Sequence, residues 1–298
     1  MSNLCKYFLT FFLKGISYLP FWILYRISDF LFVLVCYVVK YRKDVIDDNL
    51  ANAFPKKSTN ERRYLRIRFY RYLCDTSLET VKLYSMTEKQ IKKRVIFSGV
   101  DELNAFANAG KSVILLAYHH NNWEWGSALQ LQAKHRVLMV YNKMRNNLPM
   151  DNFLRCSRER WGGKAVQMGR AAKQAFDMQR QGIPTLLWLV ADQRALATSQ
   201  SWAKFLNREA AFFSGPEKIA RKTNNPVFFQ HVKRLGRGKY EINFSLLSEN
   251  PKYEEPNAIL LTYIQQMEQV IKSEPEYYLW SHKRWKHKRP IEIELIKD

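Results

Sequence analysis

Residues 112–126 read SVILLAYHHNNWEWG, a sequence that passes from an apolar run into a polar segment. Ser112 to Ala117 form a short apolar run suited to a buried strand. A polar turn that contains His119 follows, and residues 127–134 have helical character. A buried strand that leads through a polar turn into a helix is a repeating unit of α/β sheets.

Strands and helices continue to alternate toward the C-terminus. Further strands are expected at residues 136–141, 185–190, 227–233 and 239–247, and further helices at residues 149–160, from Ser214 onward, and at residues 256–272. Ser214 and Glu217 have the spacing of a capping box, which favours a helix start there. The predicted fold class is therefore α/β, with a central, mostly parallel or mixed sheet flanked by helices.

Residues 4–40 are dense in Leu, Phe, Ile, Val and Tyr and carry few charges. They do not form a clean membrane span, because Arg26 and Asp29 interrupt the stretch. The longest charge-free runs, residues 15–25 and 30–39, are shorter than the roughly 18 residues that a span needs.

Three interpretations of this N-terminal stretch stay open: a buried amphipathic helix, one imperfect span, or a helix lying in the membrane interface. We prefer a membrane anchor over residues 1–43. Its basic end, Tyr41 to Lys43, is typical of a cytoplasmic flank. Residues 44–298 would then form the second domain, on the cytoplasmic side of the inner membrane.

The 298 residues include 48 Lys and Arg against 27 Asp and Glu, a formal net charge of +21. Such a charge favours an anionic partner: nucleic acid, a membrane surface or an acidic protein. A hydrophobic content of 47% excludes a disordered chain. The cysteines lie far apart without a CxxC pair, which argues against a zinc knuckle or redox motif and favours reduced thiols: Cys5, Cys36, Cys74 and Cys156.

Two basic segments bear on the choice of partner. Ser58 and Glu61 have capping-box spacing, and the helix that they start is rich in Arg. It is either a solvated helix or a surface for anionic headgroups or an acidic carrier. Residues 282–289 hold five Lys or Arg beside Trp285, but no nucleic-acid-binding motif accompanies them, so a membrane interface suits them better.

The best catalytic candidates are His119 and Glu124, which have H-x4-E spacing across the turn after the first strand. A neutral imidazole is the usual base for a hydroxyl proton, and a carboxylate on its other nitrogen would fix the tautomer. No nucleophilic Ser or Cys accompanies the pair, which favours direct attack by a substrate hydroxyl. A structural histidine is the alternative, and no further His or Cys cluster supports a metal site.

Motifs along nearly the whole chain resemble the lipid A late acyltransferases, the lauroyl- and myristoyl-transferase family. The matching segments, in order, are residues 48–55 (DNLANAFP), 119–124 (HHNNWE), 158–163 (RERWGG), 191–193 (ADQ), 205–210 (FLNREA), 220–223 (ARKT) and 280–286 (WSHKRWK). His120 and Asn121 depart from the aromatic residue and Gly usual in the second motif. Asn tolerates left-handed backbone, so the turn can survive, and the spacing favours His119 over His120 as the base.

This resemblance implies a glycerolipid acyltransferase-like fold and transfer of a fatty acyl chain from an acyl carrier protein thioester to a hydroxyl of a lipid A precursor. It gives His119 the role of general base paired with Glu124. Arg158 would stabilise the oxyanion or hold a phosphate, and it is otherwise a surface charge. No metal or cofactor is required, and the membrane surface is a further partner.

Three more residues complete the predicted site. Asp192 and Gln193 follow the strand at residues 185–190 and would line the same cleft, although Asp192 is alternatively a strand-end cap. Asn122, inside the second motif, is expected to bind substrate. The Arg194 that follows Asp192-Gln193 departs from the family pattern and leaves the acceptor open. Alternatives are another acceptor, such as a lysophospholipid or an N-acyl amino-acid lipid, or a non-enzymatic, membrane-tethered basic protein.

Overall fold

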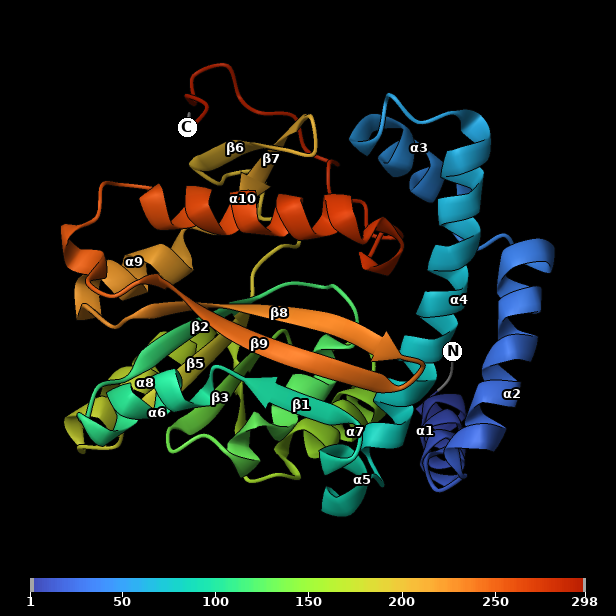
Figure 1. The fold of residues 1–298 in the computed structure, drawn as a ribbon, viewed down its shortest axis with the longest axis horizontal. Coiled ribbons are helices and arrows are strands. Elements are labelled where there is room, and N and C mark those ends of the chain that lie inside the picture. The colour runs from blue at the N-terminus through green and yellow to red at the C-terminus, as the bar shows by residue number, and fades with distance from the viewer. Residues whose placement is uncertain (1–2, 297–298) are drawn as a thin grey trace.

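The computed structural model of the chain describes residues 3–296, which fold into a central sheet with helices on both sides (Figure 1). The α-helices are α1 (Asn3–Ser17), α2 (Phe21–Val33), α3 (Lys43–Ala53), α4 (Thr59–Leu83), α5 (Glu88–Lys92), α6 (Val100–Asn108), α7 (Leu148–Glu159), α8 (Met168–Arg180), α9 (Gly215–Thr223) and α10 (Ala258–Ser273). The strands are β1 (Val95–Ser98), β2 (Val113–Ala117), β3 (Arg136–Tyr141), β4 (Lys164–Gln167), β5 (Thr185–Val190), β6 (Ser201–Phe205), β7 (Arg208–Phe212), β8 (Val227–Gly236) and β9 (Lys239–Ser248). A π-helical segment, η1 (Leu34–Val38), and the 3-10 segments η2 (Trp123–Leu131), η3 (Pro251–Tyr253) and η4 (Pro275–Tyr277) complete the elements.

The main sheet has the strand order β1-β9-β8-β2-β5-β3-β4. Its neighbours run parallel except β8 and β9, which form an antiparallel hairpin. The predicted mixed α/β sheet is therefore confirmed. A separate antiparallel hairpin, β6–β7, was not predicted from the sequence.

Helices cover both faces of the sheet, and β2 at its centre is apolar and buried at every position. Ile114 and Leu116 belong to the hydrophobic cluster with α10, whereas Val113 and Leu115 belong to the cluster with α6 and η2. Successive side chains of a strand point to opposite faces, so a continuous apolar run indicates a sheet buried on both sides. Figure 1 shows α10 on one side of the sheet and α6 on the other.

The two N-terminal helices lie beside α4 at one end of the sheet (Figure 1). Within the described part of the chain, Phe21–Val38 is the one helical segment long and apolar enough to cross a membrane, and 22% of it is buried. The predicted apolar N-terminal helix is therefore present, whereas the domain boundary at residue 43 stays a prediction. Large apolar side chains are exposed on α1, α2 and η1, among them Phe8, Phe11, Trp22, Phe30 and Val38.

Two predicted helix starts have different outcomes. The capping box of Ser58 and Glu61 is confirmed, because each residue's side chain accepts the backbone N–H of the other. The predicted box at Ser214 is wrong, since no side-chain cap forms there. Glu217 instead accepts the backbone N–H groups at the start of α10, from Asn257 and Leu260. Packing of α9 on α10 thus outweighs the local capping signal.

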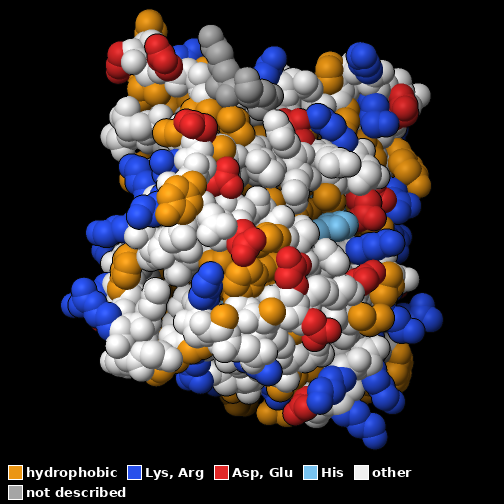
Figure 2. Space-filling model, turned by 60° about the vertical axis from the view of Figure 1, so that its left-hand side comes forward, with side chains coloured by type: hydrophobic (Ala, Val, Ile, Leu, Met, Phe, Trp, Pro, Cys, Tyr) orange, Lys and Arg blue, Asp and Glu red, His pale blue; other side chains and the backbone are white. Residues whose placement is uncertain are grey.

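Figure 2 shows how charged side chains are distributed over one face of the molecule. On the face shown in Figure 2, Lys and Arg lie mainly near the margins, with acidic side chains and small apolar patches between them. A single basic cluster does not dominate this face. On this face, the net charge of +21 is therefore not concentrated in one compact basic patch.

Candidate active site

The ends of two neighbouring strands position the central residues of the site. β2 and β5 are parallel, and the pairing of Ala117 with Val190 aligns their carboxyl ends. His119 and Asp192 each follow two residues later, on adjacent loops at the same edge of the sheet. This edge is where α/β sheets hold their functional groups.

Asp192 holds the imidazole of His119. Nδ1 of His119 lies 2.6 Å from Oδ1 of Asp192, whose carboxylate is almost completely buried. Burial alone would raise the pKa of Asp192, but the His119 ring and backbone N–H, together with the charge of Arg284, lower it below its usual value. The ionised carboxylate selects the tautomer with a proton on Nδ1, which leaves Nε2 as a base.

The free nitrogen of His119 faces Gln193. Their Nε2 atoms are 2.9 Å apart, so the amide of Gln193 donates to Nε2 in this tautomer. The edge of Trp123 packs against the imidazole with ring centroids 4.6 Å apart. The ring is therefore fixed on three sides, with its basic nitrogen turned to the residues that line the pocket.

Glu124 does not hold His119 in the way that the sequence predicted. Its two oxygens accept from Arg158, Oε2 from Nε at 2.8 Å and Oε1 from Nη2 at 2.5 Å. Burial would raise the pKa of Glu124, but the charge and hydrogen bonds of Arg158 lower it below its usual value. Glu124 meets Arg158 because it lies on the first turn of the 3-10 helix η2, and η2 packs on α7. Arg158 lies on α7.

The second histidine of the motif is part of the core. His120 is fully buried, and its Nε2 donates to the carbonyl of Glu274 at 3.2 Å. Burial lowers the pKa of His120 to about 3, so the ring is neutral. Asn121 has the left-handed φ of 50° that we expected an Asn to tolerate. The side chain of His119, in contrast, is 14% exposed.

Asn122 does not reach the pocket, in contrast to the predicted substrate contact. Its side chain is fully buried, its Nδ2 donates to Glu79 at 2.7 Å, and its Oδ1 accepts the backbone N–H of Trp125. Both polar groups of the side chain are thus used inside the protein. Asn122 caps the start of η2 and shapes the turn between His119 and Glu124.

The site opens into a mainly apolar pocket of about 380 Å³. His119, Glu124, Arg158 and Gln193 line its polar end. Apolar side chains from β3, β5, α7, α8 and α9 line the rest, including Met139, Leu154, Met168, Ala172, Trp188 and Ile219. A cavity of this size with few polar groups at one end is typical of a site for a mostly apolar ligand.

The structure thus brings together five of the six predicted residues, His119, Glu124, Arg158, Asp192 and Gln193, and leaves Asn122 outside the pocket. The predicted pairing of His119 with Glu124 differs from the observed pairing of His119 with Asp192. His119 and Asp192 each come two residues after the end of a predicted strand, and this shared position could have indicated that they pair. The ends of neighbouring parallel strands lie side by side, so the residues that follow them come close together. Within residues 3–296, no group of three or more His, Cys, Asp or Glu is arranged to hold a metal ion.

The sequence of this chain is similar to those of known proteins over most of its length. The family model described as "Bacterial lipid A biosynthesis acyltransferase" matches residues 2–287. The lipid A biosynthesis acyltransferase of Haemophilus influenzae is 23% identical over 91% of this chain and 84% of its own length. The lipid A biosynthesis lauroyltransferase of Escherichia coli is 22% identical over 94% of this chain and 92% of its own.

A further relative, the lipid A biosynthesis palmitoleoyltransferase of Escherichia coli, is 23% identical over 96% of this chain and 93% of its own. Among solved structures, the 1-acyl-sn-glycerophosphate acyltransferase of Thermotoga maritima aligns with 91% of this chain and 98% of its own, with 13% identity and a TM-score of 0.38.

Proposed function

This chain belongs to the bacterial lipid A biosynthesis acyltransferase family and is an acyltransferase, and we propose that it moves a fatty acyl chain from a carrier-protein thioester to a hydroxyl of a lipid A precursor. The observation that carries this proposal is the pairing of His119 with the buried carboxylate of Asp192 at the polar end of an apolar pocket. The pair supplies a base, and the pocket supplies room for a hydrocarbon chain.

In the proposed reaction, the acceptor hydroxyl takes the place of the Gln193 amide at Nε2 of His119. Nε2 removes the hydroxyl proton as the oxygen attacks the thioester carbonyl carbon, and Asp192 stabilises the imidazolium that forms. The tetrahedral oxyanion then collapses with cleavage of the carbon–sulfur bond. The imidazolium returns its proton to the departing thiolate, so the products are an ester and a thiol.

Arg158 is the proposed partner of the oxyanion. Glu124 occupies its Nε–H and one N–H of Nη2. A guanidinium carries five N–H groups, so three remain for the substrate. The bidentate contact with Glu124 holds the guanidinium in one orientation at the pocket wall, which is the preorganisation that electrostatic stabilisation of a transition state requires. Glu124 is therefore proposed to orient Arg158 rather than His119.

We propose that the donor is an acidic acyl carrier protein. Lys143 and Arg145 are exposed on either side of Met144, which lines the pocket. Basic side chains at this position are placed to attract an acidic carrier while its thioester enters the pocket. Lys143→Glu combined with Arg145→Glu is expected to raise KM for a carrier-bound donor and to leave KM for the same acyl chain on coenzyme A nearly unchanged.

We propose that the exposed apolar side of α1 and α2 contacts the inner membrane from the cytosol, where the acceptor lipid lies. Trp22 and Phe30 are 69% and 68% exposed. Exposure of such large apolar side chains to water is unfavourable, whereas contact with lipid would bury them. The division into an anchor at residues 1–43 and an acyltransferase domain at residues 44–298 is part of this proposal.

The test is acyl transfer by the purified protein in detergent micelles, with an acyl carrier protein thioester as donor and a lipid A precursor as acceptor. Mass spectrometry should detect a product heavier by one acyl group. His119→Ala should abolish this product. Lys239→Ala changes an exposed residue on β9 and should leave product formation unchanged.

Lipids from a deletion strain identify the acceptor in the cell. Loss of one acyl chain from lipid A would support the proposal. An unchanged lipid A together with loss of an acylated lysophospholipid or amino-acid lipid would overturn the proposed acceptor.

A further inference from the structure

Glu79, on α4, lies buried where the catalytic turn, the β8–β9 hairpin and the N-terminal helix α2 meet. Only 1% of its surface is exposed. Its carboxylate accepts three hydrogen bonds, from Nδ2 of Asn122 at 2.7 Å, from the hydroxyl of Tyr240 at 2.7 Å and from the hydroxyl of Tyr25 at 2.9 Å. The mechanism above does not use this residue.

Glu79 fixes the segment between the two functional groups of the motif. Besides the contact with Asn122, its backbone carbonyl accepts the indole N–H of Trp125 at 3.0 Å. Asn122 and Trp125 lie on either side of Glu124, and Asn122 comes three residues after His119. One residue of α4 therefore holds both ends of the first turn of η2 through its side chain and its backbone.

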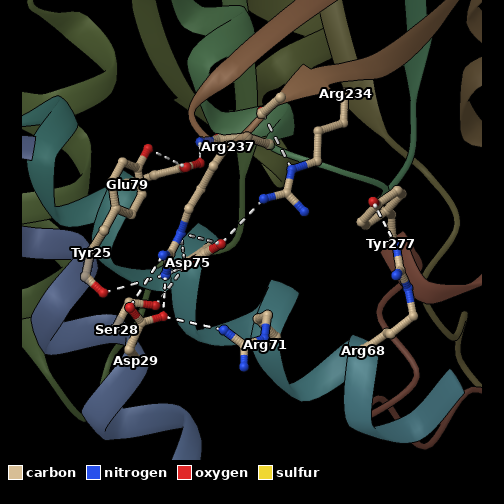
Figure 3. A network of polar contacts seen from close by, with 12 residues as sticks. Tyr25, Ser28, Asp29, Arg68, Arg71, Asp75, Glu79, Arg234, Arg237 and Tyr277 are labelled. Atoms are coloured by element: carbon tan, nitrogen blue, oxygen red, sulfur yellow. Dashed lines mark hydrogen bonds and ion pairs between the residues drawn. The ribbon is translucent and has the colours of Figure 1, made fainter. Parts of the chain in front are cut away.

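The same carboxylate reaches the N-terminal helix. Figure 3 shows Tyr25 of α2 pointing to Glu79, beside a second set of contacts in which Asp29 and Asp75 meet Arg237. The Cβ of any residue other than glycine at position 238 would lie 1.8 Å from the Tyr25 hydroxyl, so the tip of the hairpin fits closely against this tyrosine. Tyr25 is the member of α2 that contacts the carboxylate holding the catalytic turn.

We propose that Glu79 is a positioning residue that links α2 to the turn carrying His119 and Glu124, so that the N-terminal helix is part of the catalytic unit and not only an anchor. This inference rests on the proposed role of His119. Removing the acceptor on α4 releases Asn122, and the turn then samples positions in which Nε2 and the Arg158 guanidinium no longer face one carbonyl.

The experiment compares kcat and KM of four variants with those of the wild-type protein in the same detergent. Glu79→Leu should lower kcat about 100-fold with little change in KM, the loss expected from a misplaced reacting group. Glu79→Gln, which keeps an acceptor for Asn122, should retain most of the activity. Tyr25→Phe removes one hydrogen bond and should lower kcat about fivefold.

Asp29→Asn is the matched control on the same helix, because it weakens the contacts of α2 with Arg237 and Arg71 but does not touch Glu79. It should lower the Tm and leave kcat unchanged. If Glu79→Leu does not fold, the comparison of Tyr25→Phe with Asp29→Asn decides the question. Equal losses of kcat in these two variants would overturn the proposal, as would wild-type kcat in folded Glu79→Leu.

The outcome separates this inference from the proposed function. If the wild-type protein transfers no acyl group, the proposed function fails. If the wild type is active, His119→Ala is inactive and Glu79→Leu is as fast as wild type, only the role of Glu79 fails.

Discussion

Nδ1 of His119 and Oδ1 of Asp192 lie 2.6 Å apart although 73 residues separate them in the sequence. They meet because β2 and β5 are parallel neighbours whose ends are in register. The pair has the geometry by which a buried carboxylate orients an imidazole in a catalytic triad, and in the proposed reaction a substrate hydroxyl takes the place of the enzyme serine.

Asp192→Asn should lower kcat by about 10³- to 10⁴-fold, because a neutral amide no longer fixes the tautomer or stabilises the imidazolium. Steady-state kinetics of the purified variant measure this effect. Asp101→Asn, at an exposed site on α6, is the control and should keep wild-type kcat. A loss of less than tenfold in folded Asp192→Asn would mean that another group supports His119.

The Glu124–Arg158 pair should be coupled in stability and in activity. Glu124→Leu alone leaves a buried cation and should lower the free energy of unfolding by about 3 kcal/mol or more. The double change Glu124→Leu/Arg158→Met removes both charges and should recover most of that stability, as denaturant unfolding would show. Its acyl transfer should stay low because the oxyanion partner is gone. Restored activity in the stable double variant would contradict the proposed role of Arg158.

Ala172→Phe should shift the donor preference toward shorter acyl chains. Ala172 lines the apolar pocket from α8, so a phenyl ring there occupies space that a longer chain needs. The ratio of kcat/KM for long against short donors should fall about tenfold, the scale at which a hydrophobic pocket discriminates methylene groups. Lys173→Phe places the same ring at the next, exposed position and should leave the ratio unchanged.

Stability should fall in acid in part through His135. Burial lowers the pKa of this histidine to about 4, and it is neutral in the folded protein. As the pH falls below about 6.5, the unfolded chain binds a proton that the folded chain does not, so stability is lost between about pH 6.5 and 4.

His135→Gln keeps a donor for the carbonyl of Lys111 and removes this titration. Between pH 7.5 and 4.5, the wild-type protein should lose about 2–3 kcal/mol more free energy of unfolding than His135→Gln, from about 1.4 kcal/mol per pKa unit. Urea unfolding at the two pH values measures the difference. Parallel losses in the two proteins would show that His135 does not contribute.

Trp22→Asp combined with Phe30→Asp should move the protein from the membrane fraction to the supernatant. Both side chains are exposed on α2, and each charge placed in a membrane costs about 2.5–3.5 kcal/mol. Ile291→Asp, at a position that is 99% exposed near the other terminus, is the control and should stay with the membrane. Fractionation of lysates gives the readout, and an unchanged membrane fraction for the double variant would place the contact surface elsewhere.

Five of the seven strands of the central sheet were predicted from the sequence, namely β2, β3, β5, β8 and β9, whereas the short edge strands β1 and β4 were not. Residues 186–190 are apolar at every position, as expected for a strand covered on both faces, and β3 and β5 begin and end where they were predicted. His119 and Asp192 were predicted at the strand ends for the same local reason. Asn121 has the left-handed backbone that an Asn was expected to tolerate, because this preference belongs to the single residue.

The pairing of the polar groups, in contrast, follows from contacts between distant parts of the chain. Asp192 rather than Glu124 meets the ring of His119, Glu124 binds Arg158, and Glu79 reaches Asn122 from 43 residues away. Such pairs depend on strand register, on the winding of η2 and on helices packed from distant parts of the chain. A sequence pattern reports the local backbone and its burial, whereas the partner of a buried charge is set by what the completed fold places beside it.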